Sequence, residues 1–219
     1  MTYKLYNRDG SGGFVVEAAL NIAEVPFELV TLDSQPSTPL PESFRAVNPR
    51  GQVPVLITPD GTMMTESAAI LIHLAACHPD SGLGPRPATS AHARFLRWLV
   101  FMSVNLYEGL LHQIYADRFT TDPDGRTGVA KAAARRLKDS FAILEQVLEA
   151  DAFLLGDEMS AADLYLAMLN AWYGAGRGLP RCEALTHRVA RHPVIAPVWQ
   201  RNFDDRLATN WGRSEDSAG

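Results

Sequence analysis

The first third of the chain alternates between two hydrophobic periodicities. Apolar residues recur at helical spacing from Phe14 to Ile22, and short runs typical of strands lie on either side, at residues 3–6 and 27–32. Pro26 separates the helix from the second run. Because two strands joined through a helix are expected to be parallel, with a right-handed crossover, the pattern predicts a β-α-β unit.

A hairpin and another helix follow this unit. Residues 53–57 and 62–65 are predicted strands, and they flank the turn sequence Pro59-Asp60-Gly61. A single helical turn is expected at 41–46, and the apolar residues 66–76 predict a helix. The predicted order is therefore β-α-β-α-β-β-α.

The chain changes character at residues 79–90, where three prolines and two glycines occur in twelve residues. Such a segment cannot continue a helix and is typical of a linker. The segment that follows is apolar almost all round, which is typical of a helix inside a bundle or at a subunit interface. Helices are predicted at residues 91–119, 127–150, 181–191 and 194–203. A further helix is predicted to begin at Ser160, with Asp163 in the position of a capping box.

This division predicts two domains. We expect an α/β domain at residues 1–79, a linker at 80–90 and an all-helical domain at 91–203, followed by a polar tail at 204–219. An α/β unit of that size has a limited core by itself. It is therefore expected to pack against the helical domain and against a second copy of the chain.

Composition and charge narrow the class of protein. Of the 219 residues, 47% are hydrophobic and 21% are charged, the balance of a globular protein rather than of a disordered or fibrous one. The net charge of −5 argues against nucleic-acid binding through a basic surface, and no uncharged stretch approaches the ~20 residues that span a bilayer. The first residues show no signal-peptide pattern and the two cysteines form no CxxC pair, so a cytoplasmic protein is expected.

Motifs for metal and phosphate binding are missing from the sequence. His73 and His78 are five residues apart, as are His187 and His192, so neither pair has the HExxH spacing. The glycine patterns of phosphate-binding loops and dinucleotide sites do not occur either. We therefore expect neither a metal nor a phosphate-binding loop.

The segment from Asp9 to Gly13 joins the first predicted strand to the first predicted helix. Ser11 should lie near the N-terminus of that helix, where free backbone N–H groups and the helix dipole favour an anion. A serine that caps the helix between flexible glycines would give the same sequence.

Two further segments fit a ligand and also fit ordinary structure. A proline at the start of a strand loses a ladder hydrogen bond, but a cis Val53–Pro54 bond would expose the backbone N–H and C=O of Val53 to an extended peptide. An edge strand with a trans proline fits as well. At the next helix start, Ser67 could hold a carboxylate and Glu66 an ammonium, as an α-amino acid group requires, or the segment could simply cap the helix.

Taken together in this order, these segments resemble the glutathione S-transferase superfamily, in particular its bacterial theta- and beta-like cytosolic members. The resemblance covers roughly residues 3 to 203. NPRGQVPVL is similar to the family's cis-proline strand, TESAAI to its γ-glutamyl-binding helix start, and DEMSAADLYLA, at residues 157–167, to the capping box of its C-terminal domain. The resemblance implies a thioredoxin-like N-terminal domain that binds glutathione, followed by a helical domain that forms the electrophile pocket.

The resemblance also implies roles for single residues. Val53, beside Pro54, would pair with the cysteinyl backbone of glutathione. Glu66 and Ser67 would hold its γ-glutamyl end. Gln52 and Arg50 lie near the family's contacts to the glycyl end.

The residue that stabilises the thiolate is less defined by the resemblance. Ser11 aligns with the serine of theta-like members, while Tyr6 and Asn7 are the alternatives near the tyrosine of other classes. Gly12 or Gly13 stands where beta-like members carry a cysteine, which disfavours a covalent mechanism. Lowering a thiol pKa by about two units takes roughly 2.7 kcal/mol, which a hydrogen bond to the thiolate and a helix N-terminus can supply together.

The expected protein is a cytoplasmic, homodimeric glutathione transferase that uses glutathione as co-substrate, without a metal, in detoxification. It would add the thiolate to a small hydrophobic electrophile. Phe14, Tyr107, Leu111 and Tyr115 are candidates to line the electrophile pocket, although core packing would also explain them. A glutathione-dependent lyase, isomerase or dehalogenase, and a non-catalytic module that binds glutathione or another protein, are the alternatives.

Overall fold

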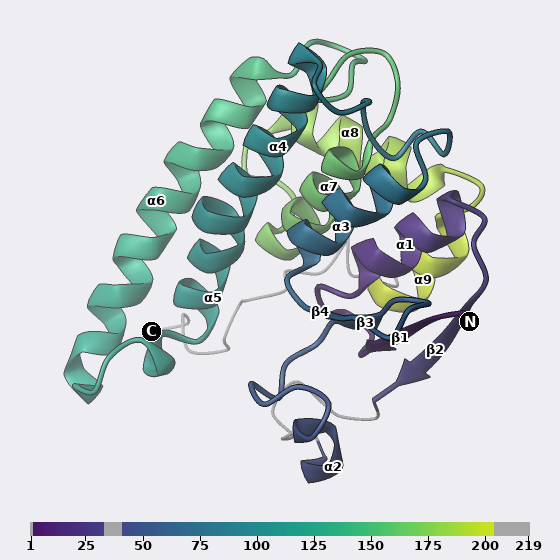
Figure 1. Cartoon of the computed structure of the whole chain (residues 1–219). Coiled ribbons are helices and arrows are strands. Elements are labelled where there is room, and N and C mark those ends of the chain that lie inside the picture. The colour runs from purple at the N-terminus through teal and green to yellow at the C-terminus, as the bar shows by residue number, and fades with distance from the viewer. Residues whose placement is uncertain (1, 33–40, 204–219) are drawn as a thin grey trace.

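The computed structural model describes residues 2–32 and 41–203, and its first part is a small sheet with helices on both faces (Figure 1). Four strands lie in the order β2-β1-β3-β4; β1 and β2 are parallel, and β3 is antiparallel to both of its neighbours. Helices α1 and α3 cover one face and the short α2 lies beyond the other. The elements are β1 (Tyr3–Asn7), α1 (Phe14–Ile22), β2 (Phe27–Thr31), α2 (Glu42–Arg45), β3 (Val55–Ile57), β4 (Met63–Met64) and α3 (Ser67–Cys77).

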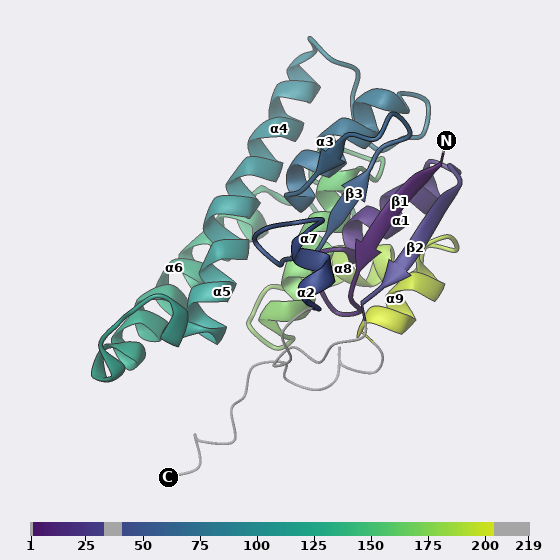
Figure 2. The ribbon, with the colours of Figure 1, turned by 60° about the horizontal axis from the view of Figure 1, so that its bottom comes forward.

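The remainder of the described chain is helical. Helix α6 runs alongside the α4–α5 segment in both views, and α7 lies between these helices and the sheet domain (Figures 1 and 2). The elements are α4 (Ser90–Met102), the π-helical η1 (Ser103–Tyr107), α5 (Glu108–Ile114), the 3₁₀ turns η2 (Ala116–Arg118) and η3 (Pro123–Gly125), α6 (Arg126–Val147), α7 (Ala161–Tyr173), α8 (Pro180–Arg191) and α9 (Ala196–Phe203).

The predicted fold class, a thioredoxin-like α/β unit followed by a helical bundle, is confirmed, together with the order of its strands and helices. The long helix predicted at 91–119 differs in two ways. It contains the π-helical segment η1, where the Asn105 side-chain amide donates to the Phe101 carbonyl that an α-helix would offer to the backbone N–H of the same asparagine. It also ends at Ile114, because the backbone of Tyr115 leaves the helical region.

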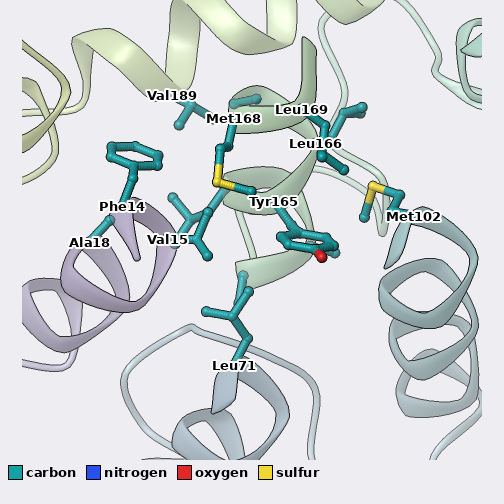
Figure 3. Packing of buried hydrophobic residues seen from close by; sticks show 14 of the residues in the cluster. Phe14, Val15, Ala18, Leu71, Met102, Tyr165, Leu166, Met168, Leu169 and Val189 are labelled. Atoms are coloured by element: carbon teal, nitrogen blue, oxygen red, sulfur yellow. The ribbon is translucent and has the colours of Figure 1, made fainter. Parts of the chain in front are cut away.

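Residues of α7 form the centre of a core shared by the two regions. The whole helix except Ala171 is buried. Val15 of α1 and Leu71 of α3 point at Met168 and Tyr165 of α7, and the sheet domain thus packs directly on the bundle (Figure 3). The predicted linker falls between α3 and α4, while the predicted tail at 204–219 lies outside the described residues.

The start of α7 is held by one buried carboxylate. Asp163 accepts hydrogen bonds from the backbone N–H groups of Leu154 and Ser160 and from the Ser160 hydroxyl, each at 2.8 Å. Burial raises the pKa of Asp163, and these hydrogen bonds act in the opposite direction.

Among the described residues, no helix is both long enough and apolar enough to cross a membrane.

Candidate functional site

The loop between β1 and α1 brings two of the three candidate thiolate-binding residues together. The Ser11 hydroxyl donates to Asn7 Oδ1 at 2.8 Å and accepts from the backbone N–H of Gly13 at 3.2 Å. Because successive strand residues point to opposite faces, Asn7 lies on the same buried face of β1 as Leu5, toward α1. Asn7 and Ser11 therefore form one hydrogen-bonded pair at the N-terminus of that helix.

The side-chain amide of Asn7 lies directly over Gly13. A Cβ atom at Gly13 would be 1.8 Å from Asn7 Oδ1, so no larger residue fits there with the asparagine in this position. Asn7 is 1% exposed, and its Nδ2 has no hydrogen-bond partner among the described residues. A buried donor left unpaired costs about 1–3 kcal/mol, and such groups in native proteins call for a functional or structural explanation.

The start of α3 is joined to this loop. The buried Ser67 hydroxyl donates to the Gly12 carbonyl at 3.0 Å. Glu66, immediately before the helix, is exposed and has a φ of 65°, a conformation that is uncommon outside glycine and is found at functional sites. The first backbone N–H groups of α3 have no acceptor within the helix, so this end of the helix can receive a carboxylate.

Tyr107, the last residue of η1, reaches the same loop from the helical region. A Cβ atom at Gly12 would be 2.8 Å from the Tyr107 hydroxyl oxygen and 3.0 Å from Ser67 Oγ. The Tyr107 ring packs edge-on against Trp172 and parallel to Tyr165, with centroids 5.3 and 6.3 Å away. Burial, reinforced by the nearby carboxylate of Glu66, raises the pKa of Tyr107 to about 12, so its phenol can donate a hydrogen bond but cannot act as a base near neutral pH.

The loop before β3 is ordered by its own side chains. Buried Asn48 donates from Nδ2 to the Gln52 carbonyl at 2.8 Å and accepts from the Arg50 backbone N–H at 3.1 Å. The exposed Arg50 donates from Nε to Gln52 Oε1 at 3.0 Å. The Val53–Pro54 peptide bond is cis, and Val53 is partly exposed.

Two candidates lie away from the Asn7–Ser11 pair. Tyr6 points to the opposite face of β1, where its ring contacts Phe44 of α2 at a centroid distance of 5.7 Å. Phe14 is fully buried and packs against Trp199 and Phe203 of α9, so its ring belongs to the core and offers no surface to a ligand.

The remaining pocket candidates keep partly exposed surfaces on and after α5. Leu111 lies within that helix, and Tyr115 follows its end, with the Arg118 guanidinium 3.9 Å from its ring centroid. Sequence reasoning missed Trp172, whose only signal was the helical spacing shared by core residues. It also missed Asn202, which accepts a hydrogen bond from the Gly10 backbone N–H although the two are 192 residues apart, a contact with no local signal.

The part of the chain that the structure describes contains no group of three or more His, Cys, Asp or Glu side chains placed to hold a metal ion. The polar groups of the site instead offer hydrogen bonds to an anion at α1, a carboxylate at α3 and an extended backbone at Val53. Those three features together match the chemistry of a small peptide with an anionic side chain.

Comparisons with known proteins agree on one family. Models of the glutathione S-transferase N-terminal and C-terminal domains match residues 15–77 and 108–190. Glutathione S-transferase theta-1 of Bos taurus is 32% identical, with 75% of this chain and 72% of that protein covered. The probable maleylacetoacetate isomerase of Caenorhabditis elegans is 29% identical, with 74% and 73% covered. The solved structure of a sphingomonad glutathione S-transferase complexed with glutathione is 26% identical and has a TM-score of 0.74, covering 90% of this chain and 97% of that one.

Proposed function

Because the chain belongs to the glutathione S-transferase superfamily, we propose that it binds glutathione as co-substrate and transfers it, through the sulfur, to small hydrophobic electrophiles. The α/β region would bind the peptide, and the helical region would contribute the electrophile's surroundings. In this reaction the protein orients the thiolate and keeps it deprotonated, and the thiolate itself is the nucleophile.

The unpaired Nδ2 of Asn7 is the observation that carries this proposal. The Ser11 hydroxyl already donates to Asn7 Oδ1, so the serine holds the amide in one orientation with Nδ2 unpaired. Because Nδ2 is itself buried, the glycine-rich loop beside it would have to shift to admit the sulfur. A thiolate at the N-terminus of α1 would accept from Nδ2 and would also be favoured by the helix dipole. Asn7 is thus the proposed thiolate donor, and Ser11 the residue that positions it.

The glutathione backbone would extend from α1 across β3 to the start of α3. The backbone N–H and C=O of Val53, beside Pro54, suit the cysteinyl residue in the manner of an added strand. Glu66 and the free N–H groups beginning at Ser67 suit the ammonium and the carboxylate of the γ-glutamyl group. The Arg50–Gln52 pair supplies a positive charge for the glycyl carboxylate.

The electrophile would approach from the helical region, beside Tyr107. The phenol of Tyr107 stays protonated because its pKa is raised to about 12, so it would donate to negative charge that develops on the electrophile during addition. Partly exposed Leu111 and Tyr115, together with Trp172, would form the apolar surroundings. Phe14, being wholly buried, has no part in this pocket.

The proposal extends to a cytoplasmic homodimer with a detoxifying role and to the domain limits of 1–79 and 91–203. Val100 and Val104, one helical turn apart, are 55% and 56% exposed. Exposed apolar side chains in such a row favour contact with another protein surface, and a second copy of the chain is the proposed partner. Sedimentation at two concentrations tests it: a monomer at both would reject the dimer without affecting the proposed chemistry.

The proposed activity is tested with purified protein and an aromatic halide as electrophile. Conjugation should require glutathione and fall at least tenfold in Asn7→Leu, while the Asn21→Leu control at the other end of α1 should match the wild type. Immobilised glutathione should retain the wild type and release it on addition of free glutathione. A chain that is retained but conjugates nothing would be a binding module, and a chain that is not retained would refute the proposal.

An isomerase that uses the same thiolate is the second candidate, because a similar protein of Caenorhabditis elegans is described as a probable maleylacetoacetate isomerase. An isomerase adds the thiolate and then releases it, so glutathione is not consumed. Measuring free thiol during turnover of a conjugated cis-dicarboxylate separates the two: constant thiol with substrate loss favours the isomerase, and falling thiol favours the transferase.

A further inference from the structure

Helix α9 lies beside α1 and contacts the loop that carries Ser11, although it comes from the far end of the described chain (Figure 1). Its Trp199 and Phe203 pack edge-on against Phe14, the first residue of α1, at centroid distances of 5.3 and 4.9 Å. Between these two aromatic residues, α9 directs Arg201 and Asn202 at the loop. The helix thus meets α1 at the end proposed to hold the thiolate.

Asn202 fixes the backbone immediately before Ser11. Its Nδ2 donates to the Val198 carbonyl of its own helix at 2.8 Å, which sets the orientation of the amide. In that orientation its Oδ1 accepts the Gly10 backbone N–H at 3.0 Å. Asn202 is 3% exposed, so water does not compete readily for this bond. Gly10 has a φ of 75°, which a residue with a side chain rarely adopts.

Arg201 neutralises two carboxylates at the same end of α1. Its Nε donates to Asp9 Oδ1 at 3.1 Å, and its terminal nitrogen pairs with Glu17, whose side chain is almost wholly buried. Glu17 lies in the first turn of α1. Two unneutralised negative charges there would disfavour a further anion, since a like charge nearby raises the pKa of an acid.

We propose that Arg201 and Asn202 are positioning residues for the thiolate site, through which helix α9 sets both the conformation and the charge balance of the loop from Asp9 to Gly13. This inference rests on the proposed function, because it concerns the sulfur of bound glutathione. It assigns neither residue a contact with the substrate.

The charge half of the proposal is tested with Arg201→Gln. The pKa of bound glutathione, read from the ultraviolet absorbance of the thiolate, should rise by about one unit, which is about a tenfold loss of thiolate at a pH below it. Arg201→Lys, which keeps the charge, should restore most of the loss. The double variant Glu17→Gln/Arg201→Gln should also restore the wild-type thiol pKa, because it removes one positive and one negative charge and so leaves the net charge beside α1 unchanged. The other charged residues near the site, Arg8 and Glu66, are kept in all of these variants.

The conformational half is tested with Asn202→Leu. We expect kcat/KM to fall about three- to tenfold, mostly in kcat, for the loss of one positioning hydrogen bond. Asn21→Leu is the matched control, because Asn21 makes the same kind of bond to its own helix, from Nδ2 to the Glu17 carbonyl at 2.8 Å, and lies at the end of α1 away from the loop. It should leave kcat/KM within twofold of the wild type.

Thermal unfolding separates positioning from mere stability. A wild-type thiol pKa in Arg201→Gln would overturn the charge half of the proposal, and a wild-type kcat/KM in Asn202→Leu would overturn the conformational half, whatever the melting temperatures of the variants. A double variant that fails to recover would also overturn the charge half. If Arg201→Gln does not fold, Asp9→Asn takes its place: Asp9 is on the surface, and removing its charge should lower the thiol pKa. Wild-type protein that shows no bound thiolate would instead refute the proposed function, and this inference with it.

Discussion

Replacing Asn7 with leucine should make the protein at least as stable while weakening its thiolate site. The side chain is buried, and Nδ2 has no partner among the described residues, so an apolar group of similar shape removes an unfavourable buried donor. The Ser11 hydroxyl loses Asn7 Oδ1 as its acceptor, but Ser11 is partly exposed and its hydroxyl can donate to water instead. The same substitution removes the proposed donor to the sulfur. Stability and activity should therefore move in opposite directions, as they do where a site is kept at the expense of stability.

The size of the effect follows from one hydrogen bond to an anion. Such a bond contributes about 1.5–3 kcal/mol, which at 1.36 kcal/mol per unit corresponds to about one to two pKa units. In Asn7→Leu we expect the pKa of bound glutathione to rise by that amount and kcat/KM near pH 7 to fall about 10- to 100-fold. Ser11→Ala leaves Nδ2 in place and should cost about threefold, through a less well oriented amide.

A titration of bound-thiolate absorbance, run alongside urea denaturation, measures both quantities. The double variant Asn7→Leu/Ser11→Ala should resemble Asn7→Leu alone, because the serine acts through the asparagine. A large loss in Ser11→Ala with near-normal Asn7→Leu would refute this reasoning and make the serine hydroxyl the direct donor. An unchanged thiol pKa in all three variants would show that the sulfur does not bind at α1.

Three further changes test other parts of the site and the fold. Tyr107→Phe should lower kcat/KM about tenfold for electrophiles that gain negative charge on oxygen, such as enones, and little for aryl halides. Because the pKa of Tyr107 is about 12, the phenol does not titrate below pH 10, and the pH–rate profiles of the wild type and the variant should have the same shape in that range. Glu66→Gln should raise KM for glutathione about tenfold in steady-state assays, with kcat nearly unchanged, by removing the partner of the γ-glutamyl ammonium. Asp163→Ala should lower the free energy of unfolding by about 3 kcal/mol in urea, because two buried N–H groups lose their acceptor, whereas Asp163→Asn should lose less.

Local patterns carried most of the fold prediction. The β-α-β unit and the Pro59–Gly61 hairpin are encoded within a few residues, and the start of α7 was marked by Ser160 and Asp163 in capping positions. The end of the long helix was misjudged because Tyr115 and Phe119 continue the helical spacing of apolar residues from Leu111 past Ile114. Periodicity describes which residues are buried and does not by itself record where the backbone leaves the helix.

The candidate site was only partly accessible from the sequence. Tyr6 and Asn7 are neighbours, yet they point to opposite faces of β1, so the two could be told apart only once the register of the strand was known. Phe14 shows the corresponding difficulty for apolar residues: a phenylalanine can lie in the core or line a pocket, and the sequence alone does not distinguish the two. The contact between Gly10 and Asn202 depends on packing between distant elements, and nothing in either local sequence records it.

The glycines of the loop explain why the same segment looked merely flexible in the sequence. Gly12 and Gly13 each lie where a side chain would collide, the first with the Tyr107 hydroxyl and the second with the Asn7 amide. A chain so rich in glycine has little conformational preference of its own, so its geometry must come from the elements around it: α3 through Ser67, η1 through Tyr107 and α9 through Asn202. Two of these three belong to the helical region. Mutations that change how an electrophile fits that region should therefore also change the acidity of the bound thiol, and the two properties should vary together in any series of variants along η1 and α9.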